Sequence, residues 1–232
     1  MKTGEDFKNG QVLLIDKPLT WTSFQAVNKL RWAIRQAFGI KKIKVGHAGT
    51  LDPLATGLLV ICTGKMTKQI NTFQGQEKEY TGTFVLGSTT PSYDLETEIN
   101  ETYSTEHITE DLVYNTTKQF TGVIEQFPPV FSAIKKDGKR LYEFARAGEA
   151  VEIKSRQVEI TEFEITNISG NNLEFRVICS KGTYIRSLAH DFGKALNSGA
   201  HLSVLRRTRI GDFKVENGLT PEEFIATLPE KI

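Results

Sequence analysis

The chain has 232 residues, of which 25% are charged, and its formal net charge at pH 7 is +1. A chain of this length can bury a large core without disulfides or metal ions. The sequence contains no apolar stretch long enough to span a membrane, and residues 1–10 (MKTGEDFKNG) carry acidic side chains where a signal peptide would be apolar. We therefore expect a cytoplasmic protein with no membrane segment.

The near-zero net charge hides an uneven distribution along the chain. Residues 1–76 contain 11 Lys or Arg and 4 Asp or Glu, residues 77–125 contain 2 and 10, and the remaining residues contain 16 and 14. A basic first third favours a polyanionic partner such as nucleic acid. A solvated helix face would produce the same cluster, so the charge alone does not decide between the two.

The first predicted elements are a strand and a long helix. Residues 11–16 (QVLLID) form an apolar run that ends at Pro18, which has no backbone N–H to donate. Thr22 and Gln25 then have the spacing of a capping box, and Gly39 is a suitable helix end. We expect a helix between them, with a stripe at spacings of three or four that consists of Phe24, Val27, Leu30 or Arg31, Ile34 and Phe38.

The rest of the chain mixes strands with helices. Strands are predicted for residues 57–64, 78–87 and 205–213, a hairpin for 156–180 with SGNN as its turn, and helices for 65–73, 140–148 and 182–199, as well as a helix capped by Thr109. An Asp-Gly turn is predicted at 137–138. Hairpins outnumber strand-helix-strand units, which favours an α+β fold. We expect one domain over residues 1–232, with residues 1–10 as a terminal tail, and buried thiols at Cys62 and Cys179.

The stretch GHAGTLDP (46–53) places a histidine and an aspartate between turn-forming residues, directly before a predicted buried strand. The Asp-Pro pair biases Asp52 toward an extended or turn conformation, so a carboxylate is displayed from a stiff loop. A nucleophilic carboxylate must stay ionised, and Arg186 is a candidate cationic partner. Equally, Asp52 could simply close a turn, and His47 could simply bond a nearby carbonyl.

The motifs of several common enzyme classes are absent from the sequence. It contains no P-loop, GxSxG, GxGxxG or HExxH pattern, and its histidines at 47, 107, 190 and 201 lack the spacing of metal ligands. No second carboxylate is placed as clearly as Asp52, which argues against a glycosidase with paired acids.

Several motifs, in order, closely resemble the bacterial tRNA pseudouridine synthase B family. They are DKPLTWTS, GHAGTLDPLATGLL, KEYTGTFVLG, PPVFSAIKKDGKRLYEFARAGE, and VICSKGTYIRSLAHDFG followed by AHLSVLRRTRIGDF. The resemblance covers residues 11 to about 225. It implies a pseudouridine synthase fold, in which a mixed, mostly antiparallel sheet carries helices and loops and a catalytic cleft crosses the sheet.

The resemblance also implies roles for individual residues. Asp52 matches the catalytic nucleophile of the family, and Arg186 matches the arginine that pairs with it. The substrate nucleotide is expected to contact Tyr80, which stacks on the uracil, and Tyr184, Leu205 and His47.

The implied reaction is the isomerisation of uridine to pseudouridine at position 55 in the TΨC loop of tRNA, by a monomer that needs no cofactor and no metal. The uridine must leave its stack to be reached, and the basic helix with Lys41, Lys42 and Lys44 could contact the phosphates.

Three features depart from the family pattern. Thr20 stands where a glycine is usual, and Asp94 is the best match to the last aspartate of a loosely kept loop motif. The chain ends about twenty residues after LRRTRIGDF, so we expect no C-terminal RNA-binding (PUA) domain. A tRNA-binding or tRNA-folding protein with dispensable catalysis remains the alternative, as does the same chemistry on another RNA.

Overall fold

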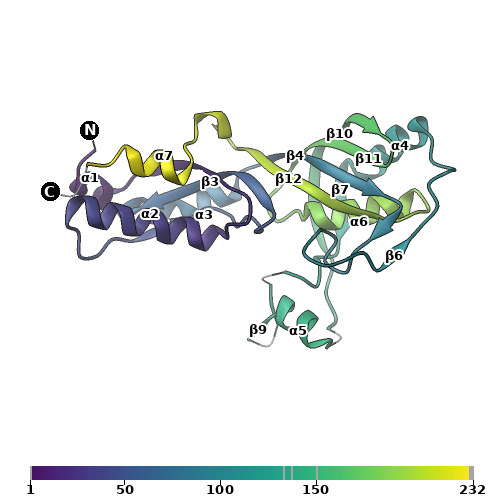
Figure 1. Cartoon of the computed structure of the whole chain (residues 1–232), viewed down its shortest axis with the longest axis horizontal. Coiled ribbons are helices and arrows are strands. Elements are labelled where there is room, and N and C mark those ends of the chain that lie inside the picture. Colours follow the sequence, from purple (N-terminus) through teal and green to yellow (C-terminus); the bar gives the residue numbers. More distant parts are fainter. Residues whose placement is uncertain (1, 133, 137, 150, 230–232) are drawn as a thin grey trace. The chain divides into compact units, whose positions relative to one another are not determined.

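The computed structural model describes residues 2–132, 134–136, 138–149 and 151–229, in two compact units (Figure 1). Unit 1 comprises residues 1–80 and 205–232, and unit 2 comprises residues 81–204. The chain leaves unit 1 within strand β4 (Lys78–Leu86) and returns to it within strand β12 (Ala200–Ile210). The single domain expected over residues 1–232 stays a prediction.

Unit 1 is a sheet with helices packed against it. Its strand order is β1, β3, β12, β4, in which β1 is antiparallel to β3 while Leu205–Arg207 of β12 run parallel to Ala55–Gly57. The elements of this unit are strands β1 (Val12–Lys17), β2 (Val45–His47), β3 (Ala55–Thr63) and β13 (Phe213–Lys214), helices α1 (Gly4–Asn9), α2 (Ser23–Phe38), α3 (Ile70–Gly75) and α7 (Pro221–Ala226), and the 3-10 helices η1 (Gly64–Gln69) and η3 (Val215–Asn217). Residues 1–10, expected as a tail, thus contain α1, whose Phe7 is buried.

Helix α2 begins and ends where the sequence predicts. Thr22 and Gln25 form the capping box, and the helix ends at Gly39 in the left-handed conformation. The buried side of α2 packs with Phe224 of α7, and these two helices lie side by side in Figure 1. One part of the prediction is wrong: Phe24 is 65% exposed, because the buried stripe of the helix is formed by Ala26, Val27, Leu30, Ala33 and Ile34.

Unit 2 is built on a mostly antiparallel sheet with strand order β12, β4, β11, β10, β7. Its aromatic core includes Phe84 of β4 stacked on Phe175 of β11 at a ring distance of 4.1 Å, with Phe163 and Phe192 beside them. The further elements are strands β5 (Ser88–Thr89), β6 (Glu101–Thr102), β7 (Gly122–Gln126), β8 (Lys135–Lys136), β9 (Lys139–Arg140), β10 (Arg156–Ser169) and β11 (Asn172–Cys179), helices α4 (Glu110–Thr117), α5 (Leu141–Ala147) and α6 (Ile185–Ala195), and the 3-10 helix η2 (Lys118–Phe120).

The α+β assignment and most predicted elements are confirmed. Ser169 pairs with Asn172 at the end of the β10–β11 hairpin, and Thr109 caps α4. Cys62 and Cys179 are fully buried, as expected. The predicted Asp-Gly turn includes residue 137, which lies outside the described residues. No helix in the described part of the chain has the length and hydrophobicity needed to cross a membrane.

Candidate functional site

The loop that carries Asp52 connects β2 to β3 in unit 1. Asp52 is half-buried, and its carbonyl oxygen accepts a hydrogen bond from the backbone N–H of Ala55, the first residue of β3 (3.1 Å). The residue before it is tied to the start of α2: the backbone N–H of Leu51 donates to the Ser23 hydroxyl (2.8 Å), and this hydroxyl donates to the Leu51 carbonyl (3.1 Å). The backbone on both sides of Asp52 is therefore fixed.

Arg207 of β12 holds the same loop from the sheet. Its guanidinium is buried and donates to three carbonyl oxygens, those of Leu58 (2.8 Å), Gly49 (3.0 Å) and Thr50 (3.5 Å). The backbone of Arg207 also lies directly against Gly57, where an added Cβ would come within 2.3 Å of the Arg207 carbonyl oxygen. This close approach explains a glycine in the middle of β3.

Lys17, at the end of β1, is a second buried cation near Asp52. Its ammonium group donates to the carbonyl oxygens of Pro18 (2.9 Å) and Trp21 (2.5 Å). Burial lowers the pKa of Lys17 to about 8; the negative charge of Asp52 opposes this shift and the positive charge of Arg207 adds to it. Asp52 therefore lies in the electrostatic field of the Lys17 ammonium group.

Thr20, at the position where the motif resemblance predicts glycine, has a backbone conformation that suits glycine. Its φ of 69° is in the left-handed region, and its backbone N–H donates to the carbonyl of Pro53 (2.9 Å). The turn next to the Asp52 loop is thus retained with threonine, at some cost in backbone strain.

Three other candidate residues lie in unit 1. His47 ends β2, and burial followed by the nearby Arg207 charge lowers its pKa, which favours the neutral imidazole. Leu205 of β12 pairs with Ala55, three residues after Asp52. Tyr80 is buried on β4, the strand beside β12. With Asp52, the unit thus gathers four candidate residues on adjoining strands and the loop between them.

Arg186 and Tyr184 lie in unit 2, at the start of α6. Arg186 is only 4% exposed, and its Nε lies 3.5 Å from an oxygen of the buried Asp94, while its Nη1 donates to the carbonyl of Ser92 (3.3 Å). The ion pair holds the 88–97 loop, in which the sequence identified Asp94, against α6. Because its side chain is buried, Arg186 is not a solvent-exposed surface residue of α6.

Tyr184 precedes α6 and is held through its backbone. Its N–H donates to the side-chain oxygen of the buried Gln126 (2.7 Å), and its carbonyl accepts from the nitrogen of the same amide (3.0 Å). The Arg156 guanidinium lies 4.6 Å from the centre of the Tyr184 ring. Gln126 therefore fixes the backbone of Tyr184, and Arg156 contacts its ring through a cation–π interaction.

Sequence reasoning did not assign a role to Ser23, Lys17 or Arg207. Lys17 and Arg207 lie inside the quoted motifs DKPLTWTS and LRRTRIGDF, so the motifs contained them, but nothing in a linear sequence shows that their charges are buried. A polar cap position explains Ser23 equally well.

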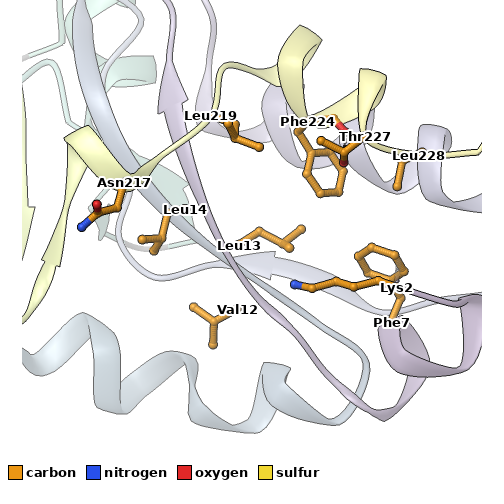
Figure 2. A pocket seen from close by; sticks show the side chains of 10 residues that line it. All are labelled: Lys2, Phe7, Val12, Leu13, Leu14, Asn217, Leu219, Phe224, Thr227 and Leu228. Carbon is orange, nitrogen blue, oxygen red and sulfur yellow. Dashed lines mark hydrogen bonds between the residues drawn. The ribbon is translucent and has the colours of Figure 1, made fainter.

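A cavity of about 410 Å³ opens elsewhere in unit 1 (Figure 2). Its walls come from α1, β1, α7 and the segment before α7, with Phe7, Leu13 and Phe224 among them. None of the candidate site residues lines it. Within the ranges that the structure describes, no group of three or more His, Cys, Asp or Glu side chains is arranged to hold a metal ion.

Comparisons with known proteins match this arrangement to one family. Residues 35–185 match the model described as TruB family pseudouridylate synthase (N terminal domain), and residues 186–229 match that of the tRNA pseudouridylate synthase B C-terminal domain. The protein named tRNA pseudouridine synthase B from Flavobacterium johnsoniae is 67% identical over 218 residues, which are 94% of this chain and 95% of that protein. Its namesake from Phocaeicola vulgatus is 59% identical, over 94% of this chain and 93% of that one.

Solved structures give the same fold. A chain of a Cbf5-Nop10-Gar1 complex superposes with a TM-score of 0.72 at 31% identity, over 97% of this chain. A chain of an H/ACA RNP bound to a substrate RNA containing 2′-deoxyuridine superposes with a TM-score of 0.69 at 29% identity, again over 97%. This chain spans 56% and 55% of those two chains, a little more than half of each.

Proposed function

The chain belongs to the TruB family of pseudouridylate synthases, and on that premise we propose that it converts the uridine at position 55 in the TΨC loop of tRNA to pseudouridine. The N1–C1′ bond of the uridine breaks and a C5–C1′ bond forms, while C5 loses a proton and N1 gains one. The reaction neither adds nor removes atoms overall, so the protein needs to supply a nucleophile, proton transfer and a binding site for the base.

The observation that carries this proposal is the 67% identity to a tRNA pseudouridine synthase B over nearly the full length of both chains. The geometry around Asp52 supports it. A catalytic carboxylate has to be held in place before the substrate arrives. The Ser23 and Arg207 hydrogen bonds do this for the loop, and the positive charge of Lys17 attracts the Asp52 carboxylate.

In this proposal Asp52 is the nucleophile. Tyr80 stacks on the target uracil, Leu205 forms the apolar side of the nucleotide site, and His47 helps to hold the flipped substrate loop. Tyr184 contacts the nucleotide, and Arg186 pairs with the catalytic carboxylate, with Asp94 holding Arg186 in position.

The substrate is proposed to be the TΨC stem-loop of tRNA, bound by a cytoplasmic monomer. Extruding a stacked uridine costs on the order of a few kcal/mol. Stacking on an aromatic ring returns about 1 to 3 kcal/mol per base, and phosphate contacts from the basic first third supply the remainder.

The test is the variant Asp52→Asn, assayed for pseudouridine in tRNA and for tRNA affinity. We expect product formation to be lost while binding is largely kept, because the amide preserves the shape of the side chain but is not a nucleophile. Asp212→Asn, the same change at an exposed aspartate of unit 1, is the matched control. Full activity in Asp52→Asn would overturn the proposal.

The same variant distinguishes the alternative of a tRNA-folding protein. A folding factor would support tRNA folding equally well with aspartate or asparagine at position 52, whereas the catalytic proposal requires the carboxylate. Mapping pseudouridine in total RNA with and without the protein tests whether RNAs other than tRNA are modified.

A further inference from the structure

Two large aromatic side chains project from α2 into solvent. Phe24 is 65% exposed and Trp32 is 58% exposed, although the same helix buries Leu30 and Ile34 completely. At about 100° per residue, Phe24 lies about 120° from the centre of the buried stripe, so no small rotation of the helix would bury it. Rings of this size on one exposed helix face are typical of an interaction surface.

The stretch of sequence that contains these rings carries charge of one sign. From residue 17 to residue 51 the sequence contains seven Lys or Arg and no Asp or Glu. Of these cations, Lys29 and Arg35 are exposed on α2 itself, and Lys41, Lys42 and Lys44 are exposed in the segment that follows. We call Phe24, Lys29, Trp32 and Arg35 the α2 outer face. Exposed aromatic rings among cations, with no acid in this stretch of sequence, match a polyanion that also presents flat rings.

Helix α2, which carries this face, begins beside the loop of the proposed nucleophile. Ser23, the first residue of α2, exchanges two hydrogen bonds with the backbone of Leu51, the neighbour of Asp52. The helix then runs for 16 residues, which is roughly 24 Å at 1.5 Å per residue. RNA that emerges from a nucleotide held at Asp52 can therefore follow the helix, since Phe24 is reached first and Trp32 about two turns later.

We propose that the α2 outer face is a second RNA-contact surface, which binds the substrate RNA beyond the target nucleotide. The rings of Trp32 and Phe24 stack on bases or riboses, while Lys29 and Arg35 contact phosphates. This inference rests on the proposed function for its ligand class, RNA, and adds a contact surface that the active-site residues do not include.

The experiment measures the affinity for full-length tRNA and for the isolated TΨC stem-loop, by fluorescence anisotropy of labelled RNA. We expect Trp32→Ala to weaken the binding of at least one of these RNAs about 5- to 150-fold, the range expected for one lost stacked base. Trp32→Phe should restore most of the affinity, because the ring is kept. Tyr114→Ala, which removes an exposed aromatic from α4, is the matched control and should bind like the wild type.

The cations are tested separately through the salt dependence. Lys29→Gln combined with Arg35→Gln should reduce the slope of log affinity against log salt by about one unit for each lost phosphate contact. Lys8→Gln, on α1, should leave this slope unchanged.

Binding by Trp32→Ala and Phe24→Ala within twofold of the wild type for both RNAs would overturn the inference. So would an effect of Trp32→Ala on self-association, seen by sedimentation, with no effect on RNA affinity, because the face would then be a protein interface. Neither result affects the Asp52→Asn test of the proposed function. Conversely, if Asp52→Asn kept full activity but Trp32→Ala still weakened RNA binding, the RNA-contact surface would be supported and the proposed function would not.

Discussion

Arg207 donates a hydrogen bond from Nη2 to the carbonyl oxygen of Gly49 at 3.0 Å, three residues before the proposed nucleophile. The bond joins a strand of the sheet to the loop that displays Asp52, and the bonds to Thr50 and Leu58 come from the same guanidinium. One buried side chain therefore fixes the position of the Asp52 loop relative to strand β12.

Replacing Arg207 by lysine should loosen this loop. A lysine has one compact cationic head and cannot reach three carbonyls in the planar arrangement of a guanidinium, so buried carbonyls lose their donors. We expect the free energy of unfolding to fall by about 2 to 4 kcal/mol in urea denaturation, and the single-turnover rate to fall with it. Arg209→Lys, on the same strand but half-buried and paired with Glu77 at 2.9 Å, is the control. Equal losses in the two variants would contradict the assignment.

Gly57→Ala should be strongly destabilising. The added Cβ would meet the Arg207 carbonyl oxygen at 2.3 Å, and φ at this residue is +102°. We expect a loss of about 3 kcal/mol or more in thermal or urea unfolding, since backbone has to move. Gly170→Ala has a left-handed φ but nothing within 4 Å of the new Cβ, so only the conformational cost of about 1 kcal/mol should appear. A tolerated Gly57→Ala would show that β3 and β12 are not packed so closely.

Thr20→Gly should stabilise the protein. Left-handed strain in a β-branched residue costs about 1 to 2 kcal/mol, and the greater freedom of glycine in the unfolded chain offsets part of the relief. The expected net gain is about 0.5 to 1 kcal/mol in the free energy of unfolding. Thr20→Ala, which keeps a Cβ, should show no such gain, and a loss of stability in Thr20→Gly would be the contrary result.

The pH dependence of stability should carry a contribution from Lys17. Its pKa in the folded protein is about 8, below the value of 10.5 in the unfolded chain, so between these values the unfolded chain holds a proton that the folded protein has released. The contribution of Lys17 to stability therefore increases from pH 8 to about 10.5 and is least favourable below pH 8. Urea denaturation at several pH values should show a steeper rise for the wild type than for Lys17→Met. Parallel curves would mean that Lys17 titrates normally.

Asp94→Asn should lower the free energy of unfolding by the amount typical of a broken buried ion pair. The variant removes the Asp94 charge from beside a guanidinium that is only 4% exposed, at an expected cost of about 3 to 5 kcal/mol in unfolding free energy. Glu162→Gln breaks the more exposed pair with Arg176, whose atoms are 2.6 Å apart, and should cost at most about 1 kcal/mol. The two losses should be measured by the same urea titration, and similar values would refute the distinction.

Local signals allowed correct prediction of most of the longer elements, although the helix predicted for 65–73 is a 3-10 helix over Gly64–Gln69 before α3 begins. The capping box at Thr22 and Gln25 and the turn between Ser169 and Asn172 depend on residues close in sequence, and both are found as expected. Phe24 was misassigned because a spacing of three or four fits two neighbouring helix faces equally well. The true stripe includes small residues such as Ala26 and Ala33, which carry little hydrophobic signal.

The candidate site was recognised through motifs and not through geometry. Asp52 and Arg186 stand in motifs that resemble a known family, so their roles could be proposed from sequence. The roles of Lys17 and Arg207 could not, because each depends on desolvation and on carbonyl groups brought together by the fold. Whether a charged side chain is buried depends on the packing of the whole molecule, so it could not be predicted from the residues next to Lys17 or Arg207.

The bond between Arg207 and Gly49 links residues 158 positions apart, with all of unit 2 encoded between them. A ribosome releases residues 46–54 long before it releases β12, so during synthesis the emerging loop has neither the Arg207 bonds nor the parallel strand beside β3. Contacts of such long sequence separation form late in folding. Assembly of the Asp52 loop is therefore among the last events in the biosynthesis of this protein. A nascent chain stalled before residue 207 would contain the proposed nucleophile but lack the hydrogen bonds that position its loop.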